Sequence, residues 1–264
     1  MPEGQPSVWL KIERAKEHIN DLEARTHGFF EPAPYDLVSE RDSETEEIVF
    51  RFQRLPHAKD IPPLWGCIAA DAIQNLRSTL DILWRRATVT STKGSGRRRG
   101  MYFPFLGPDI LKARLKRAKE PALKAALNIA STFKPYKGGN YYLWLLNEMS
   151  RIDKHEIPVL VIAAFRRGHI FAGTRNWRER GFVKHGMEVM QFSLIEDGQE
   201  FARLPGGYRR LTQDETGKKD EFTFTIAFDE GGPAKGEAVL PTLHEFLSVT
   251  NAIAEAFRRD DLIT

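Results

Sequence analysis

The chain has 264 residues, of which 41% are hydrophobic and 28% are charged, a composition typical of a globular protein that can bury a full core. Its longest apolar run, residues 157–165, is too short to span a bilayer, and its N-terminus lacks the basic start and apolar block of a secretion signal. Because Cys67 is the single cysteine, no intramolecular disulfide can form, and we expect a cytoplasmic protein without a membrane partner.

The first part of the chain predicts helices around one β-hairpin. Apolar residues recur there at the three- and four-residue spacing of amphipathic helices, except where Ile48, Phe50 and Phe52 alternate with other residues as in a half-buried strand. The expected elements are a helix over residues 8–26, paired strands over 35–39 and 47–55, a long helix over 62–88, two short helices within 108–133 and a helix over 141–155.

The pattern changes to strands near residue 157. Phe222, Phe224 and Ile226 alternate with polar residues, which indicates a sheet with one covered face. The expected elements are strands over 157–165, 169–174, 187–194 and 221–228, followed by a closing helix over 240–259. We therefore predict an α+β fold, with helices beside a mainly antiparallel sheet. It would be a single domain, 1–264, with a helical lobe at 1–156 and a β-rich lobe at 157–264.

The net charge of +3 hides an uneven distribution. Between Lys93 and Lys137 lie twelve Lys or Arg residues and two acids, a net charge of +10, which leaves −7 on the rest of the chain. Contact between Lys or Arg and a phosphate is favourable because it releases counterions. This segment therefore predicts RNA or a nucleotide as a partner. The alternative is a solvated helix next to an arginine-rich loop. The candidate phosphate contacts are Arg97, Arg98, Arg99, Arg114, Lys116 and Arg117.

The long helix over residues 62–88 has two distinct faces. One face is apolar, whereas the other carries short polar side chains in place of the Lys and Glu usual on a surface helix. Short polar groups suit a helix that lines a cleft. Arg77 lies on the boundary between the faces, and Ile82 lies in the middle of the polar face.

The helix over residues 141–155 has a second polar face, with Asn147, Arg151 and His155 opposite an apolar stripe. If the two helices pack antiparallel, both polar faces could line one groove. In the alternative interpretation, these groups only satisfy one another in a structural network. The candidate binding residues of the groove are Asp71, Asn75, Ser78, Asp81, Asn147 and Arg151.

Two blocks of the chain, WGCIAADAIQNLRSTLDIL and LWLLNEMSRIDKHEI, resemble a family of uncharacterised bacterial proteins that carry an NLRSALDH-type helix and a later DKH segment. The first block also resembles the HEPN superfamily of helical, often dimeric, metal-independent ribonucleases. In that superfamily an arginine and a histidine a few residues apart face a cleft, and the histidine assists attack by the ribose 2′-hydroxyl. The resemblance implies a HEPN-like helical core, a possible homodimer, and Arg77 as the arginine. Ile82 occupies the histidine position, so the motif lacks its general acid or base.

Two functions remain open from the sequence. The first is an RNA- or nucleotide-binding HEPN-like protein with a degenerate or altered ribonuclease site, in which His155 replaces the missing histidine and acts with Arg77. The second is a non-catalytic structural or protein-interaction module. No metal or cofactor is expected, because the chain has no HExxH, GxGxxG or GxxxxGK[ST] pattern.

Overall fold

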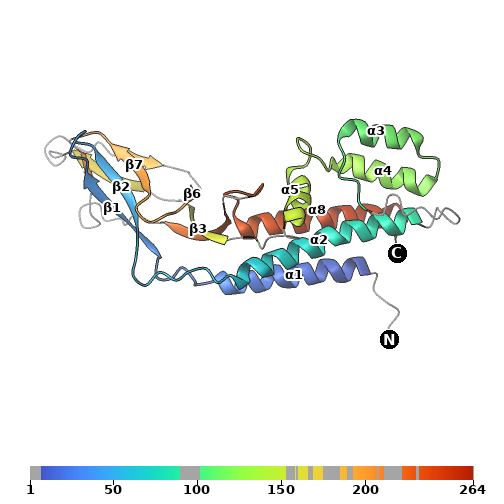
Figure 1. Cartoon of the computed structure of the whole chain (residues 1–264), viewed down its shortest axis with the longest axis horizontal. Helices are drawn as coiled ribbons and strands as arrows, with labels where there is room; N and C mark the ends of the chain where they lie inside the picture. Colours follow the sequence, from blue (N-terminus) through green and yellow to red (C-terminus); the bar gives the residue numbers. More distant parts are fainter. Residues whose placement is uncertain are drawn as a thin grey trace. The chain divides into compact units, whose positions relative to one another are not determined.

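The computed structural model describes residues 7–89, 102–152, 158, 160–165, 169–174, 185–188, 193–206, 208–210, 222–229 and 232–263. Within these residues, six helices accompany antiparallel sheets, which confirms the predicted α+β class (Figure 1). None of the described helices combines the length and the apolar character that a bilayer crossing requires.

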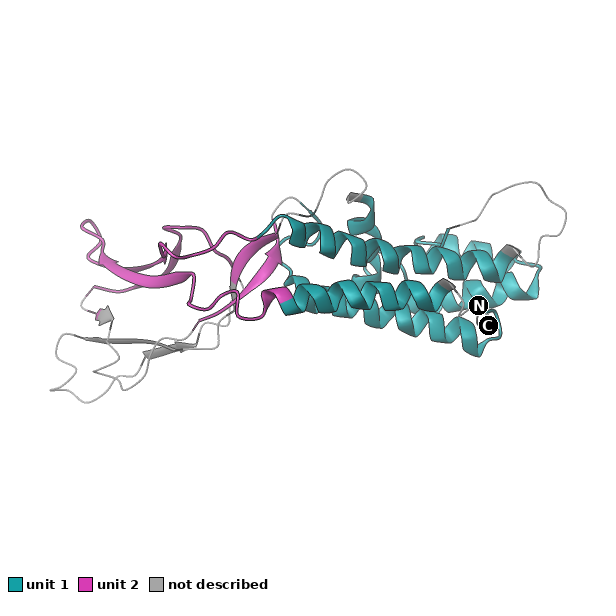
Figure 2. Ribbon diagram, turned by 90° about the horizontal axis from the view of Figure 1, so that it is seen from below, with its two compact units in different colours: residues 1–24, 62–159, 230–264 teal, residues 25–61, 160–229 magenta. Residues whose placement is uncertain are grey.

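The chain divides into two compact units, and each is built from segments far apart in the sequence (Figure 2). Unit 1 contains residues 1–24, 62–159 and 230–264, and unit 2 contains residues 25–61 and 160–229. This division differs from the expected lobes at 1–156 and 157–264. The early hairpin belongs to unit 2 because its second strand, Ile48–Arg54, pairs with the later strand Glu200–Leu204. The C-terminal helix belongs to unit 1 because its apolar stripe packs on the other helices.

Unit 1 is helical. Its helices are α1 (Ser7–Thr26), α2 (Leu64–Val89), α3 (Pro108–Arg117), α4 (Pro121–Phe133), α5 (Tyr141–Ile152) and α8 (Val239–Arg259). Proline is the first residue of both α3 and α4, where its missing N–H leaves no hydrogen bond unmade. The long helix α2 packs against α8, α5 and α4, and the apolar faces of α2 and α8 are fully buried at Leu76, Leu80, Phe246 and Phe257.

Unit 2 contains three small antiparallel sheets. The strands are β1 (Tyr35–Arg41), β2 (Ile48–Arg54), β3 (Leu160–Phe165), β4 (His169–Thr174), β5 (His185–Glu188), β6 (Ser193–Leu194), β7 (Glu200–Leu204), β8 (Tyr208–Arg210) and β9 (Thr223–Phe228). The sheet orders are β1-β2-β7, β6-β3-β9 and β5-β4-β8. The two ends of the predicted strand over 187–194 belong to β5 and β6, which pair with different strands, and residues 189–192 lie outside the described part of the chain.

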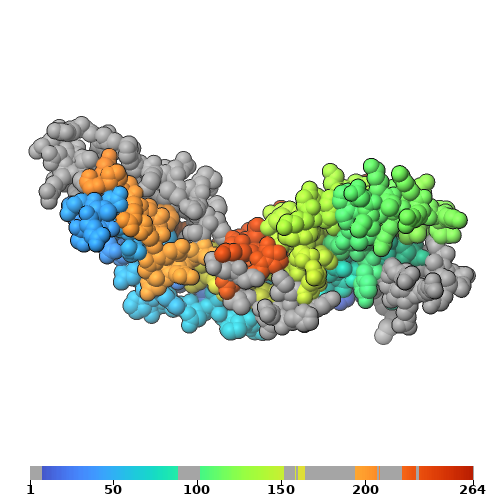
Figure 3. Space-filling view, turned by 45° about the horizontal axis from the view of Figure 1, so that its top comes forward, coloured from blue at the N-terminus to red at the C-terminus, as the bar shows by residue number. Residues whose placement is uncertain are grey.

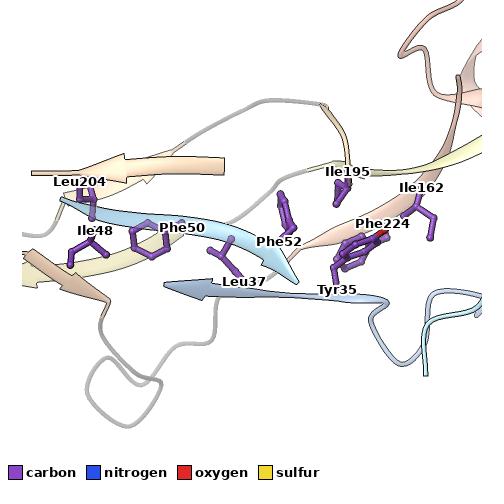
Figure 4. Close-up of a cluster of buried hydrophobic side chains, with 9 residues drawn as sticks. All are labelled: Tyr35, Leu37, Ile48, Phe50, Phe52, Ile162, Ile195, Leu204 and Phe224. Atoms are coloured by element: carbon purple, nitrogen blue, oxygen red, sulfur yellow. The ribbon is translucent and has the colours of Figure 1, made fainter. Parts of the chain in front are cut away.

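The core of unit 2 is an aromatic and aliphatic cluster between strands (Figure 4). Ile48, Phe50 and Phe52 of β2 are all buried, as predicted, but Val49 between the first two is buried as well, so the strict alternation expected there does not hold. Tyr35 stacks on Phe224 with ring centroids 6.2 Å apart, which joins the first hairpin to β9. The buried members of the cluster are Tyr35, Leu37, Ile48, Phe50, Phe52, Ile162, Ile195, Leu204 and Phe224.

Candidate functional site

The polar faces of α2 and α5 meet at Arg77. Its Nε donates a hydrogen bond to Oδ1 of Asn147 on α5 at 3.1 Å. Its Nη1 pairs with Oδ1 of Asp81, one helical turn further along α2. The side chains of Arg77 and Asp81 are only 14% and 25% exposed, so much of this ion pair is removed from water. Three of the residues predicted from two separate helices therefore lie together.

The segment that precedes α3 covers this ion pair. The backbone N–H of Phe103 donates to Oδ1 of Asp81 at 2.9 Å, and the Phe105 ring lies under the Arg77 guanidinium, with Cζ 4.5 Å from the ring centroid. Phe103 also packs edge-to-face on Trp84 of α2, with centroids 6.2 Å apart. We call the set formed by Arg77, Asp81, Asn147, Phe103 and Phe105 the Arg77 cluster. The sequence patterns did not indicate Phe103 or Phe105 as members of a site.

A chain of hydrogen bonds leads from the Arg77 cluster to the surface. Asn147 Nδ2 donates to Oε1 of Glu148 at 3.2 Å, and the other carboxylate oxygen of Glu148 accepts from Nη1 of Arg151 at 2.9 Å. The Arg151 side chain is 69% exposed. Arg151 therefore reaches the cluster only through Glu148, a residue that the sequence analysis did not select.

The remaining predicted residues of α2 face other partners. Asn75 accepts a hydrogen bond from Nζ of Lys11 on α1 at 3.0 Å and donates to the carbonyl oxygen of Asp71 at 2.8 Å. The Ser78 hydroxyl donates to the carbonyl oxygen of Asn75 at 3.1 Å, and Asp71 is exposed. Asn75 and Arg77 are two residues apart, about 200° around the helix, so one turns toward α1 and the other toward α5. The structure therefore divides the polar face that was expected to line one groove.

Several predicted residues lie outside the described part of the chain. They are His155, the candidate for proton transfer, and the candidate phosphate contacts Arg97, Arg98 and Arg99. Ile82, at the position of the histidine in the resembled motif, is partly buried.

The Arg77 cluster is suited to holding segments together. One guanidinium joins α2 to α5 and stacks on Phe105, and one carboxylate binds both that guanidinium and a backbone N–H. Among the described residues, no group of three or more His, Cys, Asp or Glu side chains could hold a metal ion.

A second candidate surface covers α3 and the start of α4. Six cationic side chains are exposed there, and within the described residues none of them forms an ion pair. The two acids in this stretch are Asp109 and Glu120, so positive charge dominates. We call this surface the cationic face, and its members are Lys112, Arg114, Lys116, Arg117, Lys119 and Lys124.

The first residue of α5 makes a polar contact with the segment before α8. Tyr141 donates its hydroxyl hydrogen to Oε1 of Glu237 at 2.8 Å. Partial desolvation of the hydroxyl raises the pKa of Tyr141 from 10.0 to about 12, and the hydrogen bond to the Glu237 carboxylate adds to this rise.

This shift predicts a loss of stability at alkaline pH. The unfolded chain releases the Tyr141 proton near pH 10, whereas the folded chain retains it up to about pH 12, so the free energy of unfolding falls as pH rises through this interval. Tyr141→Phe removes the ionisable group, and its free energy of unfolding is expected to fall less steeply over the same interval. Denaturant unfolding of both proteins at a series of alkaline pH values measures the difference, and parallel losses would contradict the assignment.

The fold and these two surfaces define an α+β protein with a cationic helical hairpin and a partly buried arginine cluster. Comparisons of the chain with protein-family models, with curated proteins and with solved structures give no match. The functional argument therefore depends on the contacts and charges of the described residues.

Proposed function

We propose that this protein binds RNA through the cationic face of unit 1, without cleaving it. The observation that carries the proposal is the group of six exposed Lys and Arg side chains on α3, α4 and the turn between them, none of which pairs with a described acid. Cations without internal partners can neutralise phosphates, and each such contact releases counterions that were condensed on the nucleic acid. Asp109 lies three residues before Lys112 and Glu120 four residues before Lys124, a spacing that allows ion pairs, yet neither acid pairs with a described cation.

The Arg77 cluster has a supporting role in this proposal. Phe105, whose ring lies under Arg77, precedes the first residue of α3 by three positions, and Asp81 holds the backbone of Phe103. Both contacts fix the chain where it enters the cationic hairpin. Arg77 and Asp81 are therefore positioning residues for the cationic face.

Binding rather than cleavage is supported at the position of the resembled HEPN motif. The resembled ribonucleases need a histidine to move a proton, and Ile82 offers no exchangeable proton at that position. The guanidinium of Arg77 is also engaged by Asp81, Asn147 and Phe105. An RNA-binding HEPN-like protein with a degenerate site agrees with these observations.

A salt series with single-stranded RNA tests the proposal. If all six cations contact phosphates, the logarithm of the binding constant should fall with the logarithm of salt concentration at a slope of about −4. Affinity would then drop roughly 250-fold between about 50 and 200 mM salt. Fluorescence anisotropy of end-labelled RNA measures the slope, and gel analysis of the same samples should show intact RNA.

The opposite result would favour the second candidate function. An RNA affinity that does not change with salt, or no binding at low salt, would leave a non-catalytic interaction module. The internal engagement of Arg77 is the observation that supports this alternative.

A further inference from the structure

We propose that the start of α5 carries a stacking site for an unpaired base of the bound RNA. The site consists of the Tyr141 and Trp144 rings with Lys137 beside them, and we call it the aromatic platform. This inference rests on the proposed RNA binding. It specifies that the bound RNA is single-stranded and names the residues that would recognise an unpaired base, which a duplex does not offer.

The two rings lie next to each other on one face of the helix. Tyr141 and Trp144 are three residues apart, which places neighbouring side chains on the same side of a helix. Their ring centroids are 5.9 Å apart and their planes are tilted by 42°. Tyr141 is 42% exposed, which makes it one of few large hydrophobic side chains in the described residues that reach solvent to this extent, and Trp144 is half-buried. Aromatic surface is therefore accessible at this point.

The turn before α5 holds the platform in place. The carbonyl oxygen of Lys134 accepts hydrogen bonds from the backbone N–H groups of Tyr136 at 2.8 Å and Asn140 at 2.9 Å. The side chain of Asn140 then accepts the N–H of Leu143 at 2.9 Å, in the manner of a helix N-cap. A Cβ at Gly139 would overlap the Lys134 carbonyl oxygen, so only glycine fits this turn.

The Tyr141 ring is also anchored through its hydroxyl, and the neighbouring Tyr142 anchors the start of α5. The hydroxyl of Tyr141 is bonded to Glu237, and Tyr142 packs edge-to-face on Phe246 of α8 with centroids 6.4 Å apart. Side chains that are already ordered lose little conformational entropy when a ligand binds. A fixed aromatic surface suits base stacking, which is sequence-tolerant because every base presents a π-face.

The platform has a carboxylate, Glu237, at the Tyr141 hydroxyl and a cation, Lys137, at the Trp144 ring, and the cation is the group that could contact a phosphate. Lys137 Nζ lies 5.6 Å from the Trp144 ring centroid, and Lys137 forms no ion pair with a described residue. Unit 1 has a similar pair in Arg258 and Trp9, with Cζ 5.5 Å from the ring centroid, but there the guanidinium is also bonded to Glu255. The Lys137 pair therefore keeps its positive charge available, whereas the Arg258 pair is neutralised.

The platform and the cationic face belong to one continuous stretch of unit 1. The helix α4 connects them, and its 13 residues span about 20 Å. Figure 3 shows the residues of α3 and α4, in green, next to those of α5, in yellow-green. A single strand could place its phosphates along the cationic face and one of its bases on Tyr141 and Trp144.

Binding measurements on leucine variants test the platform. Tyr141→Leu and Trp144→Leu should each weaken binding of single-stranded RNA by about 5- to 100-fold at constant salt. The slope of the logarithm of the binding constant against the logarithm of salt concentration should equal that of the wild type, because base stacking releases no counterions. Trp9→Leu is the matched control, since it removes the ring of the neutralised pair, and its affinity should be unchanged.

A spectroscopic measurement reports contact directly and does not depend on a leucine variant remaining folded. RNA should quench part of the tryptophan fluorescence of the wild type, and Trp144→Phe should lose this quenching while it still binds RNA. Wild-type affinity and undiminished quenching in these variants would overturn the platform and leave the proposed function standing. A wild-type protein that binds no RNA would overturn both.

Discussion

Replacing Asp81 with alanine is expected to lower the free energy of unfolding by about 3 kcal/mol. The carboxylate has two partners, the guanidinium of Arg77 and the backbone N–H of Phe103. Arg77 is only 14% exposed and Phe103 is buried, so neither group can replace the lost acceptor fully with water. Urea unfolding followed by circular dichroism measures the change.

The same helix provides a matched control. Asp71 lies ten residues before Asp81 on α2, but it is exposed and its carboxylate makes no contact with a described residue. Asp71→Ala should therefore change the free energy of unfolding by less than about 0.5 kcal/mol. Asp81→Asn keeps an oxygen that can accept the Phe103 N–H and loses the charge, so its effect should lie between the two. Equal effects of Asp71→Ala and Asp81→Ala would show that the Arg77 cluster does not stabilise the fold.

The helices could be predicted from the sequence because their apolar residues are local and periodic. The helix α8 begins one residue before the helix expected over residues 240–259 and ends at the same residue. The helix α2 begins two residues after the start of the long helix expected over 62–88. The strand β7 was missed because its sequence, Glu200–Leu204, mixes charged and apolar residues without clear alternation. Its pairing with β2 joins residues about 150 positions apart, which no local pattern reveals.

The candidate site also shows that local sequence patterns do not reveal contacts between distant segments. Helical spacing placed Asn147 on a polar face of one helix and Arg77 at the edge of the polar face of another, and their hydrogen bond brings the two helices together there. Spacing does not show that the Asp81 carboxylate also accepts a hydrogen bond from the backbone N–H of Phe103. Spacing also cannot distinguish the structural roles of Asp71 and Asp81, because both are short acidic residues on one polar face. Their different roles follow from neighbours on other segments, which depend on the tertiary fold.

The largest expected effect on binding comes from the cationic face. A triple variant with Arg114→Gln, Lys116→Gln and Arg117→Gln removes three exposed charges from α3 while it keeps long, helix-compatible side chains. If these residues contact phosphates, the slope of the binding constant against salt should become less steep by about 2. Affinity for single-stranded RNA at roughly 0.1 M salt should fall about a hundredfold.

The control for this variant changes the net charge by the same amount on other helices. Arg14→Gln, Lys16→Gln and Arg259→Gln remove three exposed cations from α1 and α8. Among the described residues they break one ion pair, Arg14 with Glu17, which is at the surface and contributes little. Long-range attraction depends on total charge and would be weakened equally in both triple variants, whereas direct phosphate contacts depend on position. A loss confined to the α3 variant would therefore show local contact. Equal losses would mean that RNA senses only the overall charge, and the cationic face would not be the binding surface.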